Sequence, residues 1–341
     1  MASEHESAAV LAGGPAAAAS AAPPAAAGIA RGLVLVAAVA LLPFAIPVNI
    51  ATEIVIFGLF AMSTNLLIGT AGLYSFGQAA FFGVGGYVAG YLAVHGLAPL
   101  PVVLLAAALA AGLMALVIGG FSIRRTGIYF MMLTFAFNQL VYYIAYSWHS
   151  VTGGEDGLAG IRRLPLDLPF VGRLGFDNHL AFYALAAVIF LAGMAALRRI
   201  VESPFGVVLA AARQNPRRTA SLGYPVHQAQ LLAFVLAGAI AGIAGALFGM
   251  LYRIMPIDSV HWVSSAYVVF MVLIGGTRSM LGPVIGAAIF IWLQGLFSLV
   301  WARWPLLLGL FVIVVMLFLP GGVLDLAERA RQAARRLWSR P

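Results

Sequence analysis

The sequence predicts an all-α, polytopic membrane protein with about ten transmembrane helices, some of them broken by Gly-rich segments. Of its 341 residues, 63% are hydrophobic and only 9% are charged, whereas a soluble domain carries about 25% charged residues. The mean hydropathy is +1.02. The apolar residues also gather into runs near the length of about 20 residues that a helix needs to cross a bilayer. These three observations together exclude a soluble globular protein.

Ten such runs follow one another along the chain. The eighth and tenth are short, so we expect them to be tilted, broken or extended by their neighbours. The expected spans are Leu33–Ile50, Ile54–Gly69, Gly77–Val94, Pro101–Ile118, Ile128–Trp148, Leu180–Leu197, Leu231–Leu251, Ser264–Gly276, Val284–Val300 and Leu306–Leu319.

Three regions are expected. Residues 1–30 form an Ala/Pro/Gly/Ser tract that cannot bury enough apolar surface to fold, which predicts a disordered cytoplasmic tail. Residues 31–322 form the transmembrane domain, which includes a polar loop at 198–229. Residues 323–341 place an apolar stripe beside several arginines, and this pattern fits either an amphipathic helix on anionic lipid or a solvated anchoring tail.

The distribution of arginine predicts the orientation. With the N-terminus inside, 14 of the 19 basic residues fall on the cytoplasmic side, and ten spans return the C-terminus to that side. Both termini are therefore expected to be cytoplasmic, with the long loop His149–Asn178 outside. The net charge of +8 reflects this asymmetry and does not indicate nucleic-acid binding.

Two residue types are missing. The chain has no cysteine, which excludes disulfides and thiolate chemistry, and all of its basic residues are arginine. Without lysine there is no standard Walker A loop and no Schiff-base nucleophile. The scattered histidines lack metal-ligand spacing, and neither GxSxG nor paired carboxylates occur within the spans. We therefore expect no enzyme activity, no catalytic residue, no metal and no cofactor; if ATP drives this protein, another chain binds it.

The segment Ser203–Gly223 is a polar island between two apolar runs. Its interior predicts a short helix, which Ser203 can cap and in which Pro204 suits the first position. Pro216 should end or kink this helix, and Gly223 suits a C-terminal stop. A surface helix of this kind can receive force from a separate motor; the alternative is a solvated loop whose arginines set topology.

Polar residues stand among glycines where the second and third spans meet. Asn65, Ser75 and Gln78 belong to this group, together with Thr70 and Tyr74. A broken helix here would present amides and carbonyls to a polar substrate, because unwound backbone at membrane depth must be buried or line a cavity. The alternative is a Gly-rich turn followed by a packing helix.

The fifth span carries a second polar group. Thr134, Asn138 and Tyr142 recur every four residues and therefore share one helix face, with Gln139 beside it. Such a face points to the protein interior and can mark a transport pathway, or it can serve interhelical hydrogen bonds alone. The seventh span adds glycines at close-packing spacing (Gly238, Gly242, Gly245 and Gly249).

Five stretches, in order, resemble the M-type permease subunits of branched-chain (hydrophobic) amino-acid ABC importers. They are NLLIGTAGLYSFGQAAFFGVGGYVAG (65–90), RRTGIYFMMLTFAF (124–137), VTGGEDGLAGI (151–161), SPFGVVLAAARQNPRRTASLGYPV (203–226) and IGGTRSMLGPVIGAA (274–288). The resemblance implies a bacterial inner-membrane subunit that pairs with a second, H-type permease and works with two ABC ATPases and a periplasmic binding protein.

The resemblance further implies that the polar island is the coupling helix that contacts an ATPase. The motif positions are Ser203, Pro204, Phe205, Gly206, Ala210, Arg213, Asn215, Ala220, Leu222 and Gly223. Branched-chain or related amino acids are the implied substrates, and amides, urea or aromatic acids are alternatives within related systems. An ion-coupled secondary transporter is the competing class, although it would favour an ionisable residue deep within a span.

Overall fold

The structure is a computed structural model that describes residues 36–168, 172–319, 321–323 and 325. The chain divides after Leu41 into two units. Of the first unit, residues 36–41 are described, and they belong to the short apolar helix Val36–Ala45. The tail predicted at 1–30 and most of the basic tail predicted at 323–341 lie outside the described residues.

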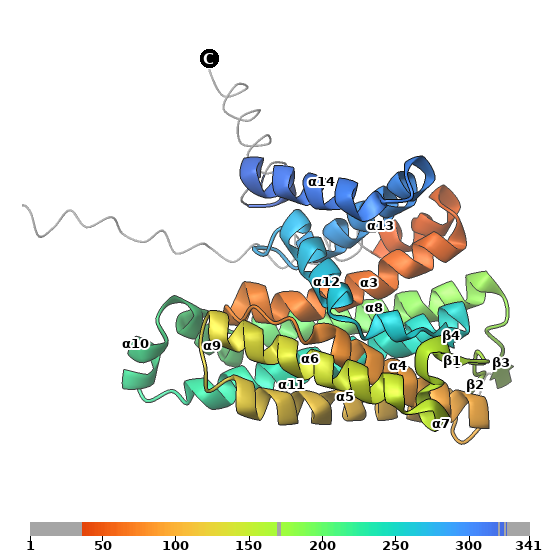
Figure 1. Ribbon diagram of the computed structural model, residues 1–341, viewed down its shortest axis with the longest axis horizontal. Coiled ribbons are helices and arrows are strands. Elements are labelled where there is room, and N and C mark those ends of the chain that lie inside the picture. Colours follow the sequence, from red (N-terminus) through yellow and green to blue (C-terminus); the bar gives the residue numbers. More distant parts are fainter. Residues whose placement is uncertain (1–35, 169–171, 320, 324, 326–341) are drawn as a thin grey trace, which may run out of the picture. The chain divides into compact units, whose positions relative to one another are not determined.

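Helices make up most of the second unit (Figure 1). The long ones are α3 (Val48–Asn65), which continues as the π-helix η1 (Leu66–Ala71), α4 (Gln78–His95), α5 (Leu100–Ser122), α6 (Ile128–Ser147), α8 (His179–Val201), α11 (Val226–Tyr252), α12 (Trp262–Gly275), α13 (Gly282–Val300) and α14 (Trp304–Phe318). The short ones are α7 (His149–Thr152), η2 (Gly154–Asp156), α9 (Pro204–Gln214), α10 (Pro216–Ser221) and η3 (Ile257–Ser259).

Among the described residues, six helices are long and apolar enough to cross a membrane: Val48–Ala71, Leu100–Ser122, Ile128–Ser147, His179–Val201, Val226–Tyr252 and Gly282–Val300. The predicted class, an all-α polytopic membrane protein, is thereby confirmed. Helices α12 and α14 have 14 and 15 residues, so the eighth and tenth runs are short helices, as the sequence indicated.

The boundary between the first two spans differs from the prediction. The sequence suggested a break between Ile50 and Ile54, but the described helices break at Ile46 and Pro47, and α3 already begins at Val48. Proline lacks the N–H that an α-helix needs and disfavours helical geometry in the residue before it. Thr52 does not interrupt α3, because its hydroxyl donates to the carbonyl oxygen of Val48 at 2.7 Å.

Helix α11 packs against α3, α4 and α5, and its glycines allow close contact. A Cβ atom at Gly245 would collide with the carbonyl oxygen of Phe82 in α4, and one at Gly242 would collide with the side chain of Ala111 in α5. Close backbone approach is the means by which helices associate where lipid supplies no hydrophobic driving force. The close packing predicted for these glycines is thereby confirmed.

Four short strands form two small sheets. Strand β1 (Leu158–Ala159) pairs antiparallel with β4 (Ile254–Met255), so that Leu158 lies opposite Met255. Strand β2 (Leu166–Leu168) pairs antiparallel with β3 (Gly172–Leu174). The first pair ties the loop after α6 to the segment after α11, far away in the sequence.

The two ends of the long helices differ in character (Figure 1). Helices α9 and α10 and the connection between α5 and α6 lie at one end, whereas α7 and the strands lie at the other. The first end carries arginines, including Arg124 and Arg218, and the second carries Glu155 and Asp156. This separation of charge agrees with the orientation expected from the arginine distribution, which stays a prediction.

Arg163 fastens the long loop to the end of α11. Its guanidinium donates to the carbonyl oxygens of Met250 and Leu251, each at 3.3 Å, and lies 4.6 Å from the ring centre of Phe182. Burial lowers the pKa of this guanidinium, and Arg253 lowers it further. The sequence indicated only a topological charge, but the side chain is 8% exposed and satisfies the carbonyls at the end of a helix.

Candidate substrate pathway and coupling segment

The break predicted after the second span is present. Helix α3 continues into η1, a π-helix of 6 residues, and Gly72 ends it in the left-handed conformation (φ +71°). The N–H of Leu73 also reaches back to the carbonyl oxygen of Leu67 at 2.9 Å. Residues 72–77 then separate η1 from α4. π-Helical turns are rare and frequently occur at functional sites.

The first turn of α4 receives its hydrogen bonds from other elements. The N-cap residue of α4 is Gly77, which has no side chain that could accept from the free N–H groups of the first turn. Instead, the N–H of Phe76 donates to Thr134 Oγ1 at 3.2 Å, and the N–H of Ala79 donates to Ser265 Oγ at 2.8 Å. The hydroxyl of Ser75 accepts from Gly77 at 3.1 Å. Helices α6 and α12 thus hold the start of α4.

Asn138 connects three elements near the middle of α6. Its Oδ1 accepts from the N–H of Ala80 in α4 at 2.9 Å, and its Nδ2 donates to the carbonyl oxygen of Val260 at 2.9 Å. Asn138 and Thr134 are both fully buried, so the predicted polar face does point into the protein. Tyr142, the third member, is half-buried, with its ring centre 5.1 Å from that of His261.

Two predicted pathway residues hold buried polar atoms without partners among the described residues. Gln78 is fully buried, and neither its Nε2 nor its Oε1 forms a hydrogen bond; the Oδ1 of Asn65 is in the same situation. Leaving such a group unpaired costs about 1–3 kcal/mol. An unpaired buried polar group in a native protein therefore calls for an explanation, of which a functional role is one.

Four of the six candidate pathway residues therefore lie together, and the other two lie elsewhere. Ser75, Gln78, Thr134 and Asn138 come together around the start of α4, whereas Asn65 lies at the junction of α3 and η1 and Tyr142 lies farther along α6. Sequence reasoning missed Ser265, which caps Ala79. A serine in an apolar run was its only signal, and its hydrogen-bond partner is 186 residues away.

The polar island contains the predicted short helix, α9, and a second helix, α10, follows it. Pro204 is the first residue of α9, the helix stops before Pro216, and Gly223 (φ +89°) follows α10. Asn215 begins α10, because its Oδ1 accepts from the N–H of Arg218 at 3.0 Å. The expected cap by Ser203 is wrong: its hydroxyl donates to the carbonyl oxygen of Ile200 at 2.6 Å and is thus directed to the end of α8.

One face of α9 is buried and the other is exposed. Gly206, Leu209 and Ala212 are buried, whereas Ala210 is exposed and Val207 is 66% exposed. A Cβ atom at Gly206 would collide with the carbonyl oxygen of Val201. The close approach that this glycine permits is therefore to the chain's own α8.

Arg213 connects α9 to η1. Its guanidinium donates to the carbonyl oxygen of Gly69, and its stem packs over Gly72, where a Cβ atom would lie 2.7 Å from Cγ of the arginine. The charged hydrogen bond holds a carbonyl of the π-helix, and Gly72 allows the close contact because it has no side chain. The last turn of α9 and the break before α4 are thus in direct contact.

Exposed apolar side chains extend this surface beyond α9. Leu222 is 72% exposed and Tyr224 is 50% exposed, and both follow α10. Phe205 is half-buried and Pro204 is exposed. Val207 of α9 and Tyr224 were not among the motif positions that the family resemblance implied. The sequence alone does not say which face of a helix is buried.

Comparison with known proteins gives the family. Residues 46–320 match the family described as branched-chain amino acid transport system / permease component. The chain belongs to this family. It is 26% identical over 307 residues to the "high-affinity branched-chain amino acid transport system permease protein LivM" of Escherichia coli (strain K12), covering 82% of this chain and 70% of that protein.

More distant relatives belong to the same kind of system. A "probable branched-chain amino acid transport permease protein LivH" of Methanocaldococcus jannaschii is 25% identical over 236 residues, which cover 68% of this chain and 73% of that protein. No solved structure matches the chain. The family and the apolar helices together establish a multi-pass membrane permease.

Proposed function

We propose that this permease is a transmembrane subunit of an ATP-binding-cassette importer that moves branched-chain amino acids delivered by a periplasmic binding protein. The family match supports transport of this substrate class. The observation that carries the mechanism is the contact of Arg213 with Gly69, which joins the predicted coupling helix to the break in the membrane helix.

The start of α4 is where we place the substrate pathway. Backbone N–H groups at a helix N-terminus carry partial positive charge and suit a carboxylate. Here those N–H groups are held by Ser75, Thr134, Asn138 and Ser265. A substrate carboxylate would reach them only after α6 or α12 moves away, so the described state is closed at this point. Gln78 then supplies amide groups that have no partner in the closed state.

Coupling follows from the other end of the same segment. A separate ATPase that moves α9 would pull on Arg213, and through Gly69 it would move η1 and residues 72–77, which lead into α4. Residues Ser203, Pro204, Phe205, Gly206, Ala210, Arg213, Asn215 and Gly223 form or frame this coupling segment. The exposed Val207, Leu222 and Tyr224 add apolar area for docking on a protein partner.

The proposal includes the rest of the assembly. A second, H-type permease, two ABC ATPases and the binding protein complete the importer in a bacterial inner membrane, with both termini of this chain inside. The LivM and LivH relatives are named as permeases of branched-chain amino acid systems, which fits a pair of permeases. We place the ATPases on separate chains, because this lysine-free sequence cannot form a standard Walker A loop.

The test is uptake by proteoliposomes that contain the complete importer and its binding protein. We expect leucine uptake to require ATP in the compartment that exposes α9. Arg213→Ala should lower uptake per ATP hydrolysed, since α9 would move without pulling η1. The matched control is Arg217→Ala, which removes an exposed arginine of α10 and should leave both rates near those of the wild type.

The outcomes separate the alternatives. Uptake driven by an ion gradient without ATP would refute the importer and favour a secondary transporter. Uptake of amides, urea or aromatic acids in preference to leucine would keep the importer and overturn the substrate. Unchanged stoichiometry of ATP to leucine in Arg213→Ala would remove the Arg213–Gly69 contact from the coupling step.

A further inference from the structure

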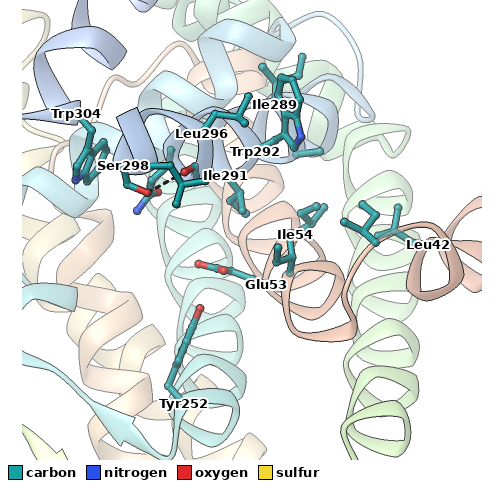
Figure 2. A pocket seen from close by; sticks show the side chains of 16 residues that line it. Leu42, Glu53, Ile54, Tyr252, Ile289, Ile291, Trp292, Leu296, Ser298 and Trp304 are labelled. Carbon is teal, nitrogen blue, oxygen red and sulfur yellow. Dashed lines mark hydrogen bonds between the residues drawn. The ribbon is translucent and has the colours of Figure 1, made fainter. Parts of the chain in front are cut away.

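A cavity of about 930 Å³ opens between the start of α3, the end of α11, and helices α13 and α14. Figure 2 shows its walls, which are mostly apolar and include Ile54, Ile291, Trp292 and Leu296. Its size lies in the range of about 300–1,000 Å³ typical of small-molecule sites. It lies away from the start of α4, and none of the candidate pathway residues lines it.

One carboxylate faces this apolar space. The Glu53 side chain extends into the cavity, and the Tyr252 hydroxyl points toward the Glu53 carboxylate (Figure 2). No basic residue lines the cavity, and no ion pair of Glu53 occurs within the part of the chain that the structure describes. The lining hydroxyl of Ser298 is engaged with the carbonyl oxygen of Gly295 at 2.9 Å. Among the described residues, the carboxylate therefore lacks a cationic partner.

The cavity lies at one end of the helices. Glu53 is in the second turn of α3, Tyr252 is the last residue of α11, and Trp304 is the first residue of α14. Helix ends with tryptophan and tyrosine are typical of the level where lipid head groups meet the hydrocarbon core. The carboxylate is thus at head-group depth, and the apolar walls continue toward the bilayer centre.

We propose that this cavity binds a phospholipid whose head group ends in a primary ammonium, as in phosphatidylethanolamine. The ammonium would donate to the Glu53 carboxylate in a charge-assisted hydrogen bond. An acyl chain would occupy the apolar space along α13. A lipid with a net negative head group is disfavoured by the carboxylate, and a quaternary ammonium has no N–H to donate.

The test uses the purified full-length chain in nanodiscs of phosphatidylethanolamine, phosphatidylglycerol and phosphatidylcholine in equal parts. Native mass spectrometry then counts the lipid that stays bound after release. Glu53→Gln removes the charge and keeps the shape. Gly295→Phe adds a ring at the α13 wall of the cavity and leaves Glu53 in place; a Cβ atom at Gly295 would meet no other atom within 4 Å. Gly120→Phe on α5 is the matched control, because it also points into open space.

We expect the wild type and Gly120→Phe to retain phosphatidylethanolamine over both other lipids. Loss of one charge-assisted hydrogen bond should lower this preference about tenfold in Glu53→Gln. Gly295→Phe should lose the bound lipid of every class. Equal retention of the three lipids by the wild type, or an unchanged preference in both variants, would overturn the proposal. So would a cross-link from Gly295→Cys to the second permease in the assembled transporter, which would make the cavity a subunit interface.

Discussion

Replacing Asn138 with leucine tests whether the hydrogen bonds around α4 contribute to stability. The amide is fully buried and holds the N–H of Ala80 and the carbonyl oxygen of Val260, both at 2.9 Å. Leucine keeps a similar volume but can neither accept nor donate. The carbonyl oxygen of Val260 then loses this partner, and the N–H of Ala80 keeps only the carbonyl oxygen of Gly77 at 3.2 Å.

The magnitude follows from the number of bonds. Interhelical hydrogen bonds in membrane proteins average about 0.6 kcal/mol, with a maximum of about 1.7 kcal/mol. Two such bonds predict that Asn138→Leu lowers the free energy of unfolding by about 1–3.5 kcal/mol. Gln139→Leu is the matched control on the next residue, because Gln139 Oε1 has no hydrogen-bond partner among the described residues. The free energy of unfolding of Gln139→Leu should equal or exceed that of the wild type.

Reversible unfolding in mixed micelles gives these free energies, and uptake per folded molecule gives the transport effect. If Asn138 lies on the pathway, uptake per folded molecule should also fall in Asn138→Leu. If it only joins helices, uptake should follow the amount of folded protein. An unfolding free energy for Asn138→Leu within about 0.5 kcal/mol of that of Gln139→Leu would refute the reasoning from hydrogen bonds.

Three further changes test other parts of the structure. Gly206→Ala should separate α9 from α8, because its Cβ meets backbone; faster proteolysis at α9 than in the wild type would show this, and an unchanged digest would contradict the packing. Arg163→Met should lower the free energy of unfolding by about 2 kcal/mol through lost charged hydrogen bonds, whereas the exposed Arg162→Met should not. Asp156→Cys should react with an impermeant thiol reagent from outside and Gln214→Cys from inside; the reverse pattern would invert the topology.

The helices could be predicted because each is a long apolar run, but their ends depend on single residues. The sequence placed the first break near Glu53, where polar residues interrupt the run. The break lies instead at Pro47. Thr52 does not interrupt α3, because its hydroxyl donates to a carbonyl oxygen of the same helix. Polarity therefore gave a weaker boundary signal than the missing N–H of proline.

The candidate site was predictable along each helix and unpredictable between helices. A spacing of four residues placed Thr134 and Asn138 on one buried face. Nothing local could show that this face holds the start of α4 together with Ser265, or that Asn138 bonds Val260, 122 residues away. The same limit applies to Arg163, whose partners at the end of α11 are 87 and 88 residues distant.

The contacts at the break join the residues that we propose for coupling and for the pathway into one segment. Arg213 holds Gly69 in η1, and residues 72–77 then lead into α4, whose first turn is held by α6 and α12. A π-helix carries more residues per turn than an α-helix, so a change between the two forms would shift residues into or out of 72–77. That shift would act directly on the hydrogen bonds that close the start of α4. Motion of α9 would therefore reach the start of α4 through one hydrogen bond and a short stretch of chain, without rearrangement of the α11 core.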